Sequence, residues 1–167
     1  MEFVLQQLKQ NKDVFISLLK GVHKDMYLWK QIPEKWCLLE IVCHLYDEER
    51  EDFRFRTQWV LENPNEKPPA INPVGWVEER RYLEQDYNTR LQKFIDEREN
   101  SIKWIESLEN PNWENSYLHP KMGKLTAKHF YDNWLAHDYL HFRQITKLKL
   151  DYLDQLSGED LNYAGIW

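Results

Sequence analysis

The sequence predicts an all-α protein built as a four-helix bundle. Two observations support this fold class. Apolar residues recur at helical spacing along four long segments. Glycine is scarce, with 5 among 167 residues, whereas a β-sandwich or barrel needs many tight turns. The length is that of one domain, which we expect to cover residues 1–167.

The first two helices are predicted over residues 2–20 and from about Cys37 to Leu61. The first carries an approximate apolar stripe and stops at Gly21. In the second, Cys37 occupies the N-cap position and Glu40 follows three residues later. We therefore expect a capping box that is weakened by sulfur in place of a hydroxyl oxygen. The inward positions of the second helix are Ile41, Leu45, Phe53 and Trp59.

A proline-rich loop is predicted over residues 62–75. At about 14 residues it is longer than a tight antiparallel turn needs, so it could let the second and third helices run parallel. The third helix is predicted over 77–108, and the turn-rich segment 111–124 could form a hairpin-like excursion. The fourth helix should begin at Thr126, a good N-cap, and end near Leu156 before Ser157 and Gly158.

Charge and cysteine content narrow the setting and the partners. The net charge is −6 and the basic residues are dispersed, so a nucleic-acid partner is not expected. Cys37 and Cys43, six residues apart on one helix, should not form a disulfide. A polar N-terminal segment and the lack of an apolar run of ~18 residues predict no membrane span and a cytoplasmic location.

Two histidines lie within an apolar stripe of the fourth helix. Spacings of three and four residues place them on one face with their apolar neighbours. Histidines at i and i+4 can both bind one ion. The stripe comprises Phe130, Trp134, His137, His141, Ile145 and Leu148.

His44 on the second helix is the best third ligand. Three histidines would leave one position open on a divalent metal, which is typical of catalytic rather than structural zinc. The alternative is that these histidines are packed, hydrogen-bonded core residues. His23 and His119 lie in predicted loops, and His129 lies on another face of the fourth helix, so none of the three is included in the predicted site.

Two metalloprotein families with similar spacing do not fit. The segment 137–141, HDYLH, has the spacing of a zincin peptidase, but Asp138 stands where the glutamate base would be. A ferritin-like di-iron bundle needs two Glu-x-x-His motifs, which the sequence lacks.

Two segments resemble the DinB/YfiT-like superfamily. The segment 36–48, WCLLEIVCHLYDE, is similar to its Trp-Ser … His-Leu-x-Asp-x-Glu stretch. Leu125-Thr126 followed by HDYLHFRQI at 137–145 is similar to its Thr … His-Asp-x-x-His-x-x-Gln-Ile stretch. Cys37 departs from the usual serine. The resemblance covers both motif helices and the order of all four helices.

The resemblance implies an up-down-down-up four-helix bundle, often a homodimer. It implies a Zn²⁺ or Ni²⁺ ion held by His44, His137 and His141. Some members resemble S-transferases that use a low-molecular-weight thiol. Nothing in this sequence identifies a pocket for such a thiol, so that activity rests on analogy.

Three hypotheses for function remain open. The first is a metal-dependent enzyme, a thiol S-transferase or a hydrolase, acting on a small-molecule substrate. The second is a non-catalytic metal-binding or dimerising bundle of stress-response type, and the third is a bundle with merely packed histidines. Asp47, Glu48 and Asp138 could serve as a general base, although a solvated or supporting role is more ordinary. Gln144 could hold an imidazole or a water molecule.

Overall fold

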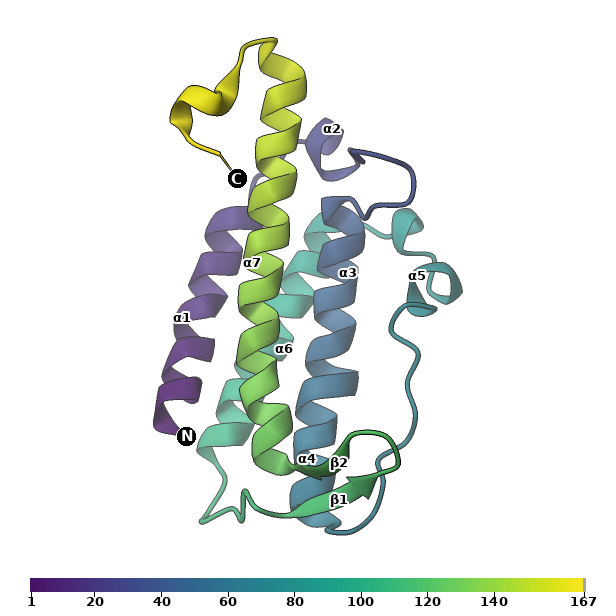
Figure 1. The fold of residues 1–167 in the computed structure, drawn as a ribbon, viewed down its shortest axis with the longest axis vertical. Helices are drawn as coiled ribbons and strands as arrows, with labels where there is room; N and C mark the ends of the chain where they lie inside the picture. The colour runs from purple at the N-terminus through teal and green to yellow at the C-terminus, as the bar shows by residue number, and fades with distance from the viewer. Residues whose placement is uncertain (167) are drawn as a thin grey trace.

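The computed structural model describes residues 1–166, so the last residue of the predicted domain lies outside the described part. Four long helical segments lie beside one another, with a small hairpin at one end (Figure 1). The elements are α1 (Glu2–Leu19), α2 (Lys24–Tyr27), α3 (Leu38–Glu48), the π-helical turn η1 (Glu49–Phe53), α4 (Arg54–Glu62), α5 (Trp76–Glu79), the 3₁₀ turn η2 (Tyr82–Glu84), α6 (Tyr87–Glu106), β1 (Ser116–His119), β2 (Gly123–Thr126), α7 (Ala127–Ser157) and the 3₁₀ turn η3 (Leu161–Ala164).

The long segments run up, down, down and up. In Figure 1, α1 rises, α3 and α4 descend, the loop 63–75 returns along the side, α6 descends and α7 rises. α3 packs against α6, α4 against α7, and α1 against both α6 and α7. This confirms the predicted all-α four-helix bundle and its topology, in which the long loop makes the second and third long segments parallel.

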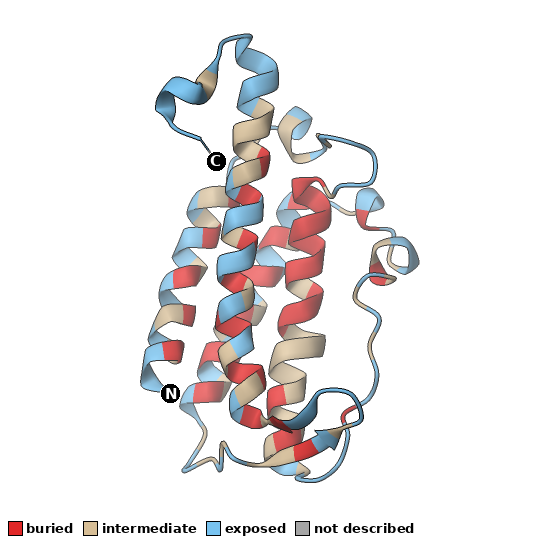
Figure 2. Cartoon of the chain, viewed as in Figure 1, coloured by how far each residue is buried: buried red, intermediate tan, exposed pale blue. Residues whose placement is uncertain are grey.

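The core follows the inward faces of these helices. Figure 2 shows buried positions on one face of α1 and α7 and over most of α3. α3 is so fully covered because α6, α7, the 3₁₀ turn η2 and the short helices α2 and α5 surround it. The large side chains of the core include Phe15, Phe94 and Trp134, and each has 0% exposure. None of the described helices is both long enough and apolar enough to cross a bilayer.

The predicted caps form at the helix ends. The Cys37 N–H donates to Glu40 Oε2 at 2.9 Å, which is one half of the predicted capping box. Thr126 Oγ1 accepts from the His129 N–H at 2.9 Å and starts α7. Gly158 ends α7 with a φ of +66°, a conformation that suits glycine. Residues 116–126 form the hairpin that the turn-rich segment suggested.

The predicted start of the third helix is wrong by ten residues. Residues 76–84 form only α5 and η2, because Arg81 takes a φ of +49° that a continuing helix cannot accommodate. The long helix α6 begins at Tyr87, where Asp86 caps it by accepting from the Thr89 N–H at 2.8 Å. Tyr82 still faces the core, but through the 3₁₀ turn, and its hydroxyl donates to Asp47 Oδ2 at 2.8 Å.

The second predicted helix is not one regular α-helix. The π-helical turn η1 separates α3 from α4 and inserts one extra residue into the helical repeat. The insertion rotates α4 relative to α3 by roughly 100°. Glu49 at this turn is buried, and its carboxylate accepts from Arg98 and Trp134 at 2.9 Å each. Phe53, at the end of the turn, packs against His137 with ring centroids 4.8 Å apart.

Candidate metal centre

The structure brings together the three histidines that the sequence singled out. His44 comes from α3, and His137 and His141 come from successive turns of α7. One nitrogen from each lies within 4.8 Å of the others. The Nε2 atoms of His137 and His141 are 3.0 Å apart. A chain segment of some 90 residues separates His44 from the α7 pair, so the bundle itself builds the cluster.

Aromatic neighbours fix the orientation of these rings. The indole of Trp36 lies against His44 with ring centroids 4.8 Å apart. Phe53, the last residue of the π-helical turn, packs on His137 at the same separation. His44 and His141 are buried, with exposures of 8% and 7%. The site therefore consists of imidazoles set in apolar walls rather than in solvent.

All three histidines are uncharged at neutral pH. Burial lowers the pKa of His44 to about 3, and the neighbouring His141 acts in the same direction. Burial, together with both other rings and Arg98, lowers the pKa of His137 to about 2. Burial also lowers the pKa of His141 to about 4, against opposing effects of Gln144 and Asp138. The rings thus keep free lone pairs, the form in which histidine binds a metal.

The donor set fits a divalent transition metal. Tetrahedral zinc with nitrogen ligands at 2.0–2.1 Å places those nitrogens about 3.3 Å apart, close to the spacing of the α7 pair. Among residues 1–166, this group contains nitrogen ligands and no carboxylate or thiol. Imidazoles suit zinc, nickel, copper or iron, whereas calcium and magnesium need oxygen ligands. The Nδ1 atoms of His44 and His141 are buried and have no hydrogen-bond partner among the described residues.

Asp47 and Asp138, two of the proposed bases, are instead buried in ion pairs. Asp138 accepts two hydrogen bonds of 2.7 Å from Arg98 and one of 3.0 Å from Asn11. Asp47 accepts from Tyr82 and pairs with Arg80 at 2.9 Å. A solvated surface role is therefore wrong for both, and neither lines a cavity at the site.

Glu48 is the carboxylate beside the cluster. Its Oε1 lies 3.9 Å from His44 Nδ1, which is too far for a hydrogen bond. Burial, together with the nearby Asp52 carboxylate, raises the pKa of Glu48 to about 9. Glu48 is only 4% exposed, so the expected solvated role is wrong here too.

Arg98 is the important residue near the site that the sequence reasoning missed. It is 1% exposed and joins the carboxylates of Glu49 and Asp138 across α6, η1 and α7. A signal was present, because Arg98 continues the inward stripe of Leu91, Phe94 and Ile102 at spacings of three and four. A charged residue on such a stripe indicates a buried partner.

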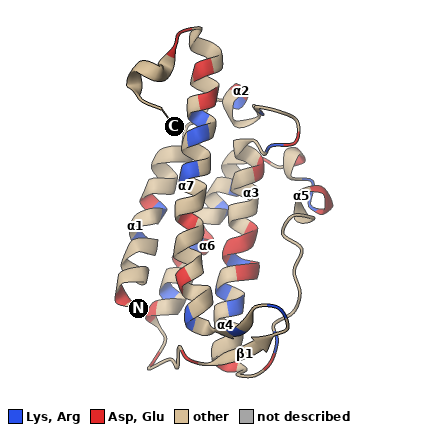
Figure 3. Cartoon of the chain, in the orientation of Figure 1, with Lys and Arg blue, Asp and Glu red and all other residues tan. Residues whose placement is uncertain are grey.

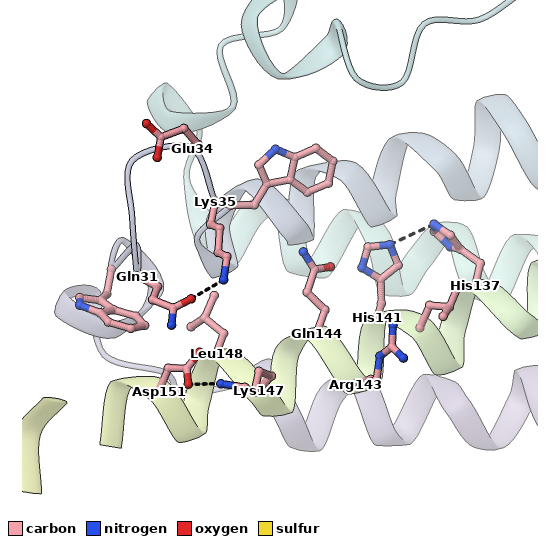
Figure 4. A pocket seen from close by; sticks show the side chains of 13 residues that line it. Gln31, Glu34, Lys35, His137, His141, Arg143, Gln144, Lys147, Leu148 and Asp151 are labelled. Atoms are coloured by element: carbon pink, nitrogen blue, oxygen red, sulfur yellow. Dashed lines mark hydrogen bonds and ion pairs between the residues drawn. The ribbon is translucent and has the colours of Figure 1, made fainter. Parts of the chain in front are cut away.

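A cavity of about 700 Å³ opens onto the histidine cluster. It runs along α7 and is covered by the segment 29–36; Figure 4 shows His137, His141, Gln144 and Leu148 along one side of it. We call it the α7 groove. Its lining comprises Trp29, Gln31, Glu34, Lys35, Trp36, His137, Leu140, His141, Arg143, Gln144, Lys147, Leu148 and Asp151. The cluster is thus reached from solvent on one side, as an open coordination position requires.

Comparison with known proteins agrees with this arrangement. The sequence model of the DinB superfamily matches residues 7–145, a span that includes all three histidines. The chain belongs to the DinB superfamily. YfiT from Bacillus subtilis, described as a probable metal-dependent hydrolase with an unusual four-helix bundle topology, superposes on this DinB protein with a TM-score of 0.76. That match covers 88% of this chain and 84% of YfiT at 15% identity, so it shows a shared fold. No curated protein matches the chain.

Proposed function

We propose that this DinB protein is a metal-dependent enzyme that hydrolyses a small molecule bound in the α7 groove. The ion would be Zn²⁺ or Ni²⁺, held by His44, His137 and His141. The observation that carries the proposal is a cluster of three uncharged imidazoles, two of which, His137 and His141, line a cavity of about 700 Å³. The description of YfiT as a probable metal-dependent hydrolase supports the same reaction class.

The protein's own groups would prepare the site for this chemistry. A bound divalent ion supplies Lewis-acid activation of water or of a substrate oxygen. Gln144, on the groove wall one turn from His141, offers an amide that can orient a polar substrate group. Trp36 shields His44 and lines the groove, so it limits water around the reacting group.

Thiol-dependent S-transfer is the second candidate, and one observation bears on it. Cys37 and Cys43 are buried, and neither lines the groove. Burial raises the pKa of Cys37 to about 11 and that of Cys43 to about 12, so neither is a ready thiolate nucleophile. A transferase of this structure would therefore need a separate low-molecular-weight thiol. A non-catalytic metal-binding bundle is the outcome if metal binds and no substrate class reacts.

Metal analysis of protein purified without an affinity tag tests the first step. We expect close to one equivalent of zinc or nickel, and less than a tenth of an equivalent in His44→Ala and His141→Ala. His23→Ala is the matched control, because its side chain is 81% exposed and does not belong to the histidine cluster. A protein that contains no metal and cannot be loaded would overturn the proposal.

Substrate panels then separate the two reactions. Metal-loaded protein is offered ester, amide and phosphoester substrates without thiol, and model electrophiles with several thiols. Turnover without thiol that is lost in His44→Ala supports hydrolysis. Product formed only with thiol would replace hydrolysis by S-transfer. We also propose that the protein is cytoplasmic and forms a homodimer. Sedimentation equilibrium of the metal-loaded protein tests the homodimer.

A further inference from the structure

A second cavity adjoins the histidine cluster on the side nearer the hairpin. It measures about 330 Å³ and lies between the β1–β2 hairpin, the η1–α4 segment and the first turns of α7. We call it the hairpin pocket. His119 and His129, which the sequence analysis set aside, both line it. Neither belongs to the histidine cluster, so this pocket adds surface beside the metal centre rather than ligands.

The two cavities meet at the metal centre. His137 and Leu140 line both of them, whereas their remaining lining residues differ. Along α7 the lining residues run from His129 in the hairpin pocket to Asp151 in the α7 groove. At 1.5 Å per residue this is a path of roughly 33 Å. A molecule that occupies both cavities must pass His137, and hence the ion that His137 would help to hold.

The lining of the α7 groove holds three basic side chains, Lys35, Arg143 and Lys147, against two acidic ones, Glu34 and Asp151. Lys147 pairs with Asp151 on the same helix, and Lys35 donates to Gln31 (Figure 4). Arg143 has no carboxylate within ion-pair distance among the described residues. The chain as a whole is negative, and Figure 3 shows acidic residues gathered in the middle of the long helix formed by α3, η1 and α4. This excess of one positive charge, together with the dication that the three uncharged histidines would hold, favours an anionic ligand in the groove.

The hairpin pocket is aromatic instead. Its apolar lining comprises Phe53, Tyr117, Met122, Leu125, Phe130, Ala136 and Leu140. Its arginine, Arg56, is neutralised by Asp52 at 2.6 Å and lies over the Phe130 ring at 5.9 Å. This pocket therefore favours an apolar or aromatic group.

We infer that the substrate has two arms: an anionic arm in the α7 groove and an apolar or aromatic arm in the hairpin pocket, with the bond between them beside His137. The inference rests on the proposed function. Hydrolysis of such an ester or amide adds one water across the acyl bond. It leaves a carboxylate on one arm and an alcohol or amine on the other.

Hydroxamates, which bind divalent ions through two oxygens, provide probes with defined arms. Cobalt-loaded protein is titrated with acetohydroxamate, benzohydroxamate, succinic monohydroxamate and phosphonoacetohydroxamate, and the visible cobalt spectrum reports binding. We expect benzohydroxamate, and at least one of the two anionic hydroxamates, to bind at least tenfold more tightly than acetohydroxamate. The preferred anion distinguishes a carboxylate from a phosphate substrate. If none of these probes binds more tightly than acetohydroxamate, the inference is overturned.

Paired variants assign each arm to its cavity. The double variant Lys35→Gln with Arg143→Gln should weaken the preferred anionic probe about tenfold and leave benzohydroxamate unchanged. Met122→Trp should fill the hairpin pocket, weaken benzohydroxamate at least tenfold and spare the anionic probe. All three positions are exposed, so the fold should tolerate these changes.

The same titrations separate this inference from the proposed function. Metal content and acetohydroxamate affinity should stay constant in the variants, since neither depends on an arm. If metal and acetohydroxamate bind but the variants affect all probes equally, the two-arm inference is wrong and the metal centre stands. If no metal binds, the proposed function itself fails.

Discussion

Arg98 holds Asp138 through two parallel hydrogen bonds of 2.7 Å in the core of the bundle, and Asp138 directly follows His137 in the sequence. The same guanidinium binds Glu49 of the π-helical turn at 2.9 Å. Arg98 thus links the two segments that carry the histidines. Its paired carboxylates, Asp138 first, raise the pKa of Arg98 above the ordinary arginine value despite its complete burial.

Replacing Arg98 by methionine should strongly destabilise the protein. Two carboxylates would be left buried without a counter-ion, and breaking a buried pair in this way costs about 3–5 kcal/mol. Urea unfolding followed by circular dichroism measures the loss. Lys12→Met is the control. Lys12 pairs with Glu99, which is far more exposed than the partners of Arg98, so the loss of this ion pair should cost about 1 kcal/mol or less. An Arg98→Met protein as stable as the parent would contradict the assigned role.

The apo protein should lose stability as the pH falls below about 6.5. The three folded-state histidine pKa values are depressed, to about 3, 2 and 4, so the unfolded chain binds more protons below 6.5. Stability then declines by about 1.4 kcal/mol per pH unit for each such histidine. Unfolding in the presence of a chelator at several pH values measures this slope.

Removing one of the histidines tests that origin. His137→Leu should reduce the slope between pH 6.5 and 4.5 by about a third of the contribution of the three rings. Leu140→Ala, a change on the same stretch of α7 that removes no titrating group, should keep the parental slope. Equal slopes in the parent and His137→Leu would show that the ring titrates normally.

Metal affinity should resist mild acid. A histidine with an ordinary pKa of 6.5 is mostly protonated at pH 5 and competes poorly for metal, whereas these three remain uncharged. We expect the dissociation constant for zinc to change by less than about tenfold between pH 7 and pH 5. Competition with a chelator of known affinity at each pH provides the measurement. Release of the metal near pH 6 would contradict it.

Both cysteines should be unreactive in the folded protein. Burial raises the pKa of Cys37 and of Cys43, and both side chains have exposures of 0–1%. Iodoacetamide at pH 8 should add no group to the native protein and two groups after denaturation in urea, as read by mass spectrometry. Rapid labelling of the native protein would contradict the burial of the two thiols.

Periodicity and capping residues predicted most of the bundle. The stripe on residues 130–148 and the caps at Cys37 and Thr126 correspond to structural features. The two wrong predictions, a continuous second helix and an early start of the third, lie where the local sequence pattern does not decide the structure. The π-helical turn depends on Glu49 meeting Arg98 and Trp134, which are distant in sequence. The late start of α6 depends on a left-handed Arg81 that no propensity marks.

The histidines were identifiable because they interrupt an apolar stripe, but their surroundings were not. The segment 29–36 lines the α7 groove opposite α7, and the hairpin lines the second pocket; neither segment carries helical periodicity. The helical periodicity places His129 and His137 on different faces of α7, so the sequence does not predict that they share a cavity. The hairpin folds back over α7 and encloses a cavity lined by both. Only the tertiary structure shows this proximity.

The return loop 63–75 also has a consequence for how the chain folds. An up-down-up-down bundle can form by successive docking of neighbours, whereas here α3 packs against α6, which lies beyond a loop that spans the bundle. Contacts between segments far apart in sequence raise contact order, and high contact order slows folding. This topology should therefore fold more slowly than a simple bundle of the same length. The histidine cluster is itself such a long-range contact, because some 90 residues separate His44 from the pair on α7.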